Sequence, residues 1–214
     1  MIKAVLFDMD GVLVDSEKWI CKAAIQMFQE LGLDVEEDDF LPFVGTGENR
    51  YIGGVADKYD FEIDIEACKE RTYKIYLEII QNNLDPLPGV NQFIHKCRAL
   101  GLKIAVATSA DEIKMKANLH EIGLPESVFD ATVNGLMVEK KKPFPDIYLL
   151  AASLLNVNPE ECLVVEDAVN GVEAAKYAKA KCLALTTSFP KEMLKEADWF
   201  AKTLEDAPKE CLLW

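Results

Sequence analysis

The sequence predicts an α/β fold whose core is a doubly wound parallel sheet. Short apolar runs with little polar alternation are typical of parallel strands that are covered on both faces. Such runs occur at residues 3–8, 103–108, 162–166 and 182–186, with weaker candidates at 131–134 and 199–201. Segments with helical periodicity alternate with them from about residue 90 onward, at 90–100, 111–122, 145–155 and 172–180. This alternation of strand and helix predicts a Rossmann-like core.

The segment between the first two strands departs from that alternation. It offers helix-like stretches at residues 17–31, 50–59 and 65–81 and no convincing strand. Prolines and glycine at residues 86–89 then mark the return to the alternating pattern. We therefore expect a core formed by residues 1–14 and 85–214, and a helical cap domain formed by residues 15–84. An insertion after the first strand is well placed to act as a lid.

The composition excludes some classes of partner. The formal net charge is -14, from 37 acidic and 23 basic residues, whereas nucleic acids and anionic membranes attract a positive field. We expect neither as a partner. No signal peptide or transmembrane run is apparent, which predicts a cytoplasmic protein, and a monomer is the default for such a core-plus-cap plan. Six scattered cysteines without a Cys-x-x-Cys pair predict reduced thiols in the core.

Four polar groups fall at, or in loops next to, the predicted C-terminal ends of the strands. They are Asp8-Met9-Asp10-Gly11, Thr108-Ser109, Lys142 and Glu166-Asp167. Each is common when taken singly, as a helix N-cap or as part of a solvated charge run. The carboxyl ends of parallel strands meet at one edge of a sheet, so residues far apart in sequence would share a site there. Their joint position therefore predicts one functional site.

In order and type these groups resemble the four motifs of the haloacid dehalogenase superfamily. The helical insertion after the first motif and the segments 142–146 and 166–171 are most similar to its phosphatase and beta-phosphoglucomutase branch. The resemblance implies that Asp8 is a nucleophile that forms an aspartyl phosphate. It also implies Mg2+ as cofactor, held by Asp8, the main-chain carbonyl of Asp10, Glu166 and Asp167. Mg2+ prefers such oxygen ligands, and an attack of anion on anion needs a cation.

The remaining motif residues suit the binding of a phosphoryl group. The Thr108 hydroxyl and the Ser109 main-chain N–H can hold a phosphoryl oxygen at a helix N-terminus, and Lys142 adds positive charge beside it. Asp10, two residues from the nucleophile, can protonate the leaving oxygen and then deprotonate water. Dehalogenases of the resembled family lack this second aspartate and need no metal. Asp10 and Asp167 together therefore favour phosphoryl transfer.

The cap decides between hydrolase and mutase. Family members of the beta-phosphoglucomutase kind carry a histidine, an arginine and a lysine for a second phosphate. The corresponding places here hold Ile20, the run 45–50 with a displaced Arg50, and Asp111. We therefore expect a Mg2+-dependent phosphatase acting on a small phosphorylated metabolite, such as a sugar phosphate. The alternatives are a beta-phosphoglucomutase-like sugar phosphomutase and a non-enzymatic phosphate-binding regulator.

Three cap residues are candidates for reading the substrate. They are Glu48, Asn49 and Arg50, which adjoin one another at the predicted start of a cap helix. Their alternative role is that of a polar loop that caps this helix.

Overall fold

The computed structural model describes residues 1–44 and 46–214, so Gly45, in the cap run 45–50, lies outside the described residues. These residues form one parallel six-stranded sheet in the order β3-β2-β1-β4-β5-β6. The strands are β1 (Ala4–Phe7), β2 (Lys103–Ala107), β3 (Ala131–Val133), β4 (Cys162–Glu166), β5 (Lys181–Leu185) and β6 (Trp199–Ala201). The predicted doubly wound sheet is confirmed, including its two weaker strands.

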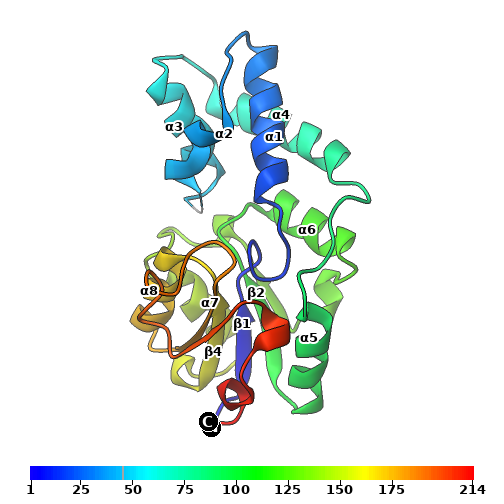
Figure 1. Cartoon of the computed structure of the whole chain (residues 1–214), viewed down its shortest axis with the longest axis vertical. Helices are drawn as coiled ribbons and strands as arrows, with labels where there is room; N and C mark the ends of the chain where they lie inside the picture. Colours follow the sequence, from blue (N-terminus) through cyan, green and yellow to red (C-terminus); the bar gives the residue numbers. More distant parts are fainter. Residues whose placement is uncertain (45) are drawn as a thin grey trace.

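Helices cover both faces of this sheet (Figure 1). One face carries α5 (Val90–Ala99) and α6 (Glu112–Glu121), and the other carries α7 (Asp146–Leu154) and α8 (Val169–Tyr177). Successive residues of a strand point to opposite faces, so residues of both parities in β1 are buried. This double burial is why the strands show apolar runs without alternation.

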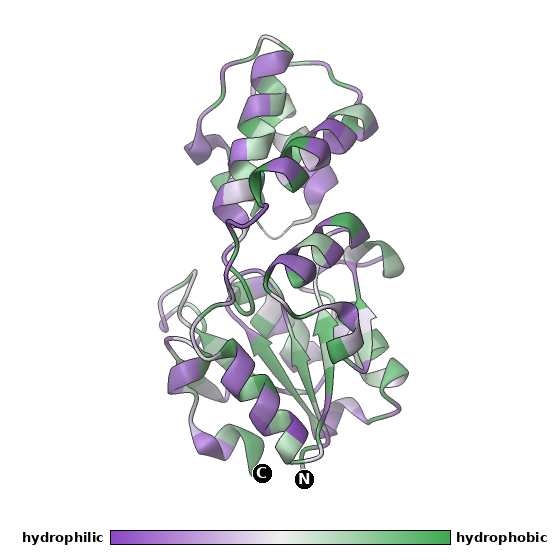
Figure 2. Ribbon diagram, turned by 90° about the vertical axis from the view of Figure 1, so that its right-hand side faces the viewer, coloured by the Kyte–Doolittle hydropathy of each residue, from purple (hydrophilic) through white to green (hydrophobic). Residues whose placement is uncertain are grey.

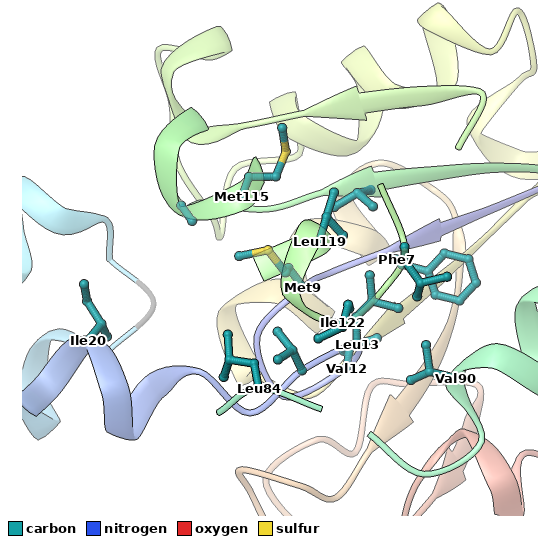
Figure 3. Packing of buried hydrophobic residues seen from close by; sticks show 14 of the residues in the cluster. Phe7, Met9, Val12, Leu13, Ile20, Leu84, Val90, Met115, Leu119 and Ile122 are labelled. Atoms are coloured by element: carbon teal, nitrogen blue, oxygen red, sulfur yellow. The ribbon is translucent and has the colours of Figure 1, made fainter. Parts of the chain in front are cut away.

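The apolar layer on the α5 and α6 side continues beyond the sheet toward the cap. Phe7 of β1 packs in one cluster with residues of α5 and α6. Met9 and Leu13, which follow the strand, carry the same cluster to Ile20 of the first cap helix (Figure 3). All of these side chains are almost completely buried. The cap is therefore packed onto the core through a continuous apolar contact.

The helix ends around the core follow the predicted signals, with one exception. Gly101 and Gly123 have φ angles of 72° and 70° just after α5 and α6, as expected of C-terminal glycines. Helix α8, however, begins at Val169 and not at the predicted residue 172. Gly171 lies inside its first turn, where a Cβ would overlap the Glu166 side chain. The sequence prediction took this glycine for part of a loop, whereas it makes room for a carboxylate.

Among the described residues, the cap contains four α-helices, which lie beyond the C-terminal edge of the sheet (Figure 1). They are α1 (Glu17–Glu30), α2 (Glu37–Phe40), α3 (Glu48–Lys58) and α4 (Ile65–Ile79). The main packing is α1 against α4, with α3 also against α4. The sequence did not predict α2, because its single turn is too short to show a period. A capping box between Glu36 and Asp39 closes that turn.

Short 3-10 turns occupy several loops. They are η1 (Leu41–Phe43), η2 (Glu126–Val128), η3 (Gly135–Met137), η4 (Pro159–Glu161), η5 (Leu204–Asp206) and η6 (Lys209–Leu212).

The two connections between cap and core run side by side. Val14 forms β-bridges with both Asp10 and Pro86, and the Leu87 N–H donates to the Leu13 carbonyl at 2.9 Å. The division into residues 15–84 and the two flanking core segments stays a prediction.

Both chain ends lie at the pole opposite the cap (Figure 2), where the Ile2 N–H donates to the Trp214 carbonyl at 2.9 Å. The six cysteines are free and buried. In the part of the chain that the structure describes, no helix has the length and apolarity needed to cross a membrane.

Candidate active site

Asp8 is the first residue after β1, and its backbone still belongs to the sheet. Its N–H donates to the Val165 carbonyl at 3.0 Å, which fixes the side chain at the carboxyl edge. Lys142, from the loop before α7, places its Nζ 2.6 Å from Asp8 Oδ1 and 2.6 Å from Glu166 Oε1. Burial alone would lower the pKa of Lys142, but Asp8 and Glu166 outweigh it and raise that pKa. Lys142 is therefore a fixed cation between two carboxylates.

Three buried carboxylates gather around this lysine. Asp8, Glu166 and Asp167 each offer an oxygen, and these atoms lie within 4.8 Å of one another. Burial raises the pKa of Asp167 well above its ordinary value, and the neighbouring Glu166 and Asp8 raise it further. A Cβ at Gly11 would overlap Asp167, so the carboxylate fills space that only glycine leaves. Clustered carboxylate oxygens of this kind fit Mg2+, whose charge would offset their repulsion.

Glu166 serves mainly to hold its neighbours in place. Its Oε1 accepts from Lys142 Nζ at 2.6 Å and from the Tyr148 hydroxyl at 2.8 Å. Its Oε2 accepts from the N–H groups of Asp167 at 2.8 Å and Ala168 at 2.9 Å. Because four donors already use this carboxylate, Asp8 and Asp167 have more oxygen lone pairs free for a cation.

The segment after β5 adds two hydroxyl groups that the sequence analysis missed. Ser188 Oγ donates to Asp167 Oδ2, and Thr187 Oγ1 donates to the Gly11 carbonyl at 2.6 Å. Both residues line the same cavity as the carboxylates. The available signal was the pair Thr187-Ser188, which directly follows the predicted strand at residues 182–186.

Thr108 and Ser109 follow β2 and line the same cavity as Asp8. Thr108 Oγ1 accepts the Ala110 N–H at 3.1 Å, which leaves its proton free to donate to a ligand. The Ser109 hydroxyl oxygen is buried and has no partner among the described residues. Helix α6 begins three residues later, at Glu112. Free N–H groups at a helix N-terminus attract anions, so this segment can hold phosphoryl oxygens.

Asp10 is held by donors on both carboxylate oxygens. Lys114 Nζ donates to Oδ2 at 2.9 Å, and Ser16 Oγ donates to Oδ1. Asn118 Nδ2 in turn donates to Ser16 Oγ at 3.1 Å, and the Tyr76 hydroxyl donates to Asn118 Oδ1. A chain of hydrogen bonds therefore runs from cap helix α4 to Asp10.

Sequence reasoning missed Lys114 and Asn118, although a signal existed. They lie four residues apart on α6, on the buried side that Met115 and Leu119 also occupy. A polar pair at i and i+4 inside an apolar stripe indicates a buried polar site. The sequence analysis found acidic Asp111 in place of the lysine of mutases. The structure shows that Lys114 brings a cation into the cavity from one turn later.

The three cap residues that the sequence suggested as substrate-reading candidates lie in different environments in the structure. Glu48 lines the cavity, and its proposed role in reading the substrate stays a prediction. Asn49 instead bonds to Glu66 and Lys69 on the cap surface. Arg50 has a side chain that is 62% exposed and an Nη1 3.8 Å from Asp57. Neither Asn49 nor Arg50 is among the residues that line the cavity. Consecutive helical residues point about 100° apart, so an inward Glu48 turns its two successors away.

These residues enclose a cavity of about 640 Å³ between core and cap. The carboxyl edge of the parallel sheet carries an aspartate, a buried lysine and an acidic pair. This arrangement is typical of hydrolases that use an aspartate in the active site. The chain belongs to the haloacid dehalogenase-like hydrolase family, whose model matches residues 2–179. The predictions that it is an enzyme of this family, on an α/β fold, are confirmed.

Three relatives illustrate the family. Protein SUPPRESSOR OF QUENCHING 1, chloroplastic, of Arabidopsis thaliana is 45% identical over 199 residues, which cover 92% of this chain and 19% of that protein. The phosphorylated carbohydrates phosphatase of Thermotoga maritima is 33% identical over 177 residues, with 83% and 82% covered. The structure of CbbY from Rhodobacter sphaeroides in complex with xylulose-(1,5)-bisphosphate has a TM-score of 0.85 at 29% identity, with 96% of each chain covered. This chain thus spans about a fifth of the first relative and most of the others.

Proposed function

We propose that the chain is a Mg2+-dependent phosphatase that hydrolyses a small phosphorylated metabolite, such as a sugar phosphate, through an aspartyl phosphate on Asp8. The observation that carries this proposal is the contact of Asp8 with Lys142 at 2.6 Å, beside the acidic pair Glu166 and Asp167. Thr108 and Ser109 line the same cavity. The Thermotoga relative that is named a phosphorylated carbohydrates phosphatase supports the same class of substrate.

The reaction follows from the positions of these side chains. An Asp8 oxygen attacks phosphorus, the bond from phosphorus to the leaving oxygen breaks, and Asp10 gives its proton to that oxygen. Asp10 then takes a proton from water, the water oxygen attacks phosphorus, and the bond to Asp8 breaks. Phosphate leaves and Asp8 is restored. Thr108, Ser109 and Lys142 hold the phosphoryl oxygens throughout.

The metal would be held by four groups. They are Asp8, Asp167, the Asp10 carbonyl and Glu166. Mg2+ would supply positive charge where the anionic nucleophile meets the anionic phosphate.

Water is the proposed final acceptor of the phosphoryl group, because the cavity has few cationic side chains that could hold a second phosphate. Within residues 1–44 and 46–214, its lining includes two cationic side chains, Lys114 and Lys142. Lys142 is paired with Asp8 and Glu166, and Lys114 with Asp10. A sugar phosphomutase needs further donors for a second phosphate. The expectations of a monomeric, cytoplasmic enzyme without nucleic-acid or membrane partners stay predictions.

The test is release of inorganic phosphate from a panel of phosphomonoesters that includes p-nitrophenyl phosphate. We expect activity with Mg2+, its loss with a chelator, and its return when Mg2+ is added back. Asp8→Asn should lower turnover by on the order of 10⁴-fold or more, the scale expected when a nucleophile is removed. The exposed Asp57 gives a matched control, Asp57→Asn, that should behave as the wild type.

Two results would overturn this proposal. Full activity in Asp8→Asn would show that another group attacks phosphorus. Conversion of beta-glucose 1-phosphate to glucose 6-phosphate, with little free phosphate, would establish a phosphomutase.

A further inference from the structure

The cap half of the cavity contains two glutamates that each have one buried carboxylate oxygen without a hydrogen-bond partner among the described residues. Glu17 is the first residue of α1 and Glu48 the first of α3, and both line the cavity. Glu17 Oε1 and Glu48 Oε2 are buried and accept no hydrogen bond from any described residue. Glu48 as a whole is only 7% exposed. Buried acceptors are rarely left unpaired, so these oxygens fit a ligand that brings hydrogen-bond donors.

The cations around these carboxylates are already engaged. Lys114 lies close enough for Glu17 and Glu48 to raise its pKa, but its Nζ donates to Asp10. Lys69 pairs with Glu66 and Asp111, and Lys141 donates to the Gly135 carbonyl.

Each of these cations in the cap half therefore already has a partner. Of these cations only Lys114 lines the cavity, where three carboxylates, Asp10, Glu17 and Glu48, lie around it. A second phosphate or a carboxylate on the leaving group would lie beside these acidic side chains without a free cation to pair with.

The rest of the cap lining is largely apolar. Ile20, Phe43 and Val44 contribute to it, together with the ring of Tyr51. Apolar walls with a few placed acceptors suit a ligand that has C–H faces and hydroxyl edges.

We infer that the cap half of the cavity binds an uncharged, polyhydroxylated leaving group, whose hydroxyls donate to Glu17 and Glu48, and that it rejects a second anionic group. This inference rests on the proposed phosphatase function and deepens it. The substrate is then the monophosphate of a sugar or polyol, and its bisphosphate is a poor substrate. Glu17 and Glu48 thereby determine the specificity for the leaving group, while the strand-end residues bind the phosphoryl group.

The test compares kcat/KM for three esters with Mg2+ present. They are a hexose 6-phosphate, the matching hexose 1,6-bisphosphate and p-nitrophenyl phosphate, which has no hydroxyls. The wild type should prefer the monophosphate to the bisphosphate by about 100-fold or more. Glu17→Gln and Glu48→Gln should each lower kcat/KM for the monophosphate by about 10- to 100-fold, because an acceptor oxygen is replaced by an amide NH2 group that cannot accept a hydrogen bond. The same variants should lose about tenfold less kcat/KM on p-nitrophenyl phosphate than on the monophosphate. The ratio of kcat/KM for the monophosphate to that for the bisphosphate should also decrease.

Glu70→Gln is the matched control, because Glu70 is an exposed cap glutamate paired with Lys74. It should leave all three values as in the wild type. A folding defect in the test variants would lower the three values in parallel, whereas the inference requires their ratios to change.

The outcomes separate this inference from the function beneath it. A wild type that hydrolyses p-nitrophenyl phosphate but prefers the bisphosphate would overturn the inference alone. So would Glu17 and Glu48 variants whose three values fall in parallel. A chain that releases no phosphate from any ester would overturn the proposed phosphatase and this inference with it.

Discussion

The carboxylates in the two halves of the cavity differ in whether their oxygens have hydrogen-bond and ion-pair partners. In the core half, Lys142 lies between Asp8 and Glu166, and Glu166 accepts hydrogen bonds on both oxygens. In the cap half, Glu17 and Glu48 each present a buried oxygen without a partner among the described residues. The core half is therefore assembled before any ligand arrives, whereas the cap half needs the ligand to complete its hydrogen bonds.

This difference follows from how each half is built. The carboxylates of the core half stand at the ends of β1 and β4, where the sheet fixes their separation. The cap carboxylates begin two separate helices, so they can change with the leaving group without disturbing the sheet. On the proposed function, the binding of phosphate and the recognition of the leaving group are thus divided between elements with different constraints.

Lys142→Met breaks the core half and should have the largest effect. It leaves Asp8 and Glu166 buried and facing each other without their shared cation. Removing one partner of a buried ion pair costs about 3–5 kcal/mol of unfolding free energy, and phosphate release should be abolished. Urea denaturation at pH 7 measures the first effect and the phosphate assay the second.

The exposed Lys74, paired with Glu70, supplies the control for this prediction. Lys74→Met should cost less than about 1 kcal/mol, because exposed ion pairs contribute little. If Lys142→Met proved as stable as Lys74→Met, the ion pairs of Lys142 with Asp8 and Glu166 would not stabilise the core half.

Ser16→Ala tests the hydrogen-bond chain that joins the two halves. Ser16 is completely buried, donates to Asp10 and accepts from Asn118. Without it, Lys114 is the one side-chain donor to Asp10 that remains among the described residues. We therefore expect kcat to fall by about 10- to 100-fold, part of the contribution of an acid-base group. KM should change little. Asp10→Asn should show the larger loss.

The conservative variant distinguishes positioning from packing. Ser16→Thr keeps the hydroxyl and should restore most of kcat, although it adds a methyl group to a buried site. Equal losses in Ser16→Ala and Ser16→Thr would count against a role for the hydroxyl in orienting Asp10.

The sequence predicted the residues that strand ends bring together. Asp8, Thr108, Glu166 and Asp167 each follow or end an apolar run, and parallel strands place such residues at one edge. Lys142 stands in a loop before a helix, where it was one of the four polar groups predicted to share a site, and the resemblance to the family then matched it to a motif. The sheet and the core motifs were therefore predictable from local patterns and their order.

The partners of Asp10 depend on tertiary contacts that no local pattern encodes. Ser16, Asn118 and Tyr76 come from three separate segments and meet only because α4 packs near α6. In the cap, the sequence pointed to three adjacent residues, but which of them faces inward depends on where α3 begins. It begins at Glu48, two residues before the predicted start, and that start directs Glu48 into the cavity.

The smallest expected effect concerns the stability cost of the unpaired cap carboxylate. Burial raises the pKa of Glu48 from 4.5 to about 7, against the opposing charge of Lys114, and the nearby Asp111 and Asp10 contribute to the rise. The folded chain therefore holds this proton more tightly than the unfolded chain, so stability falls as pH rises from about 4.5 to about 7. Glu48→Gln removes this pH-dependent loss of stability and leaves Lys114, Asp111 and Asp10 in place.

The variant should thus be more stable than the wild type at pH 8, by about 1–3 kcal/mol, and nearly equal to it at pH 4.5. Urea denaturation at the two pH values, without substrate, measures the difference. Glu70→Gln should show no such gain, because Lys74 lowers the pKa of Glu70. No gain at pH 8 in Glu48→Gln would mean that Glu48 is satisfied without a ligand. A gain, combined with a loss of activity on the sugar monophosphate, would show that the cap half keeps a destabilising carboxylate for the substrate that completes it.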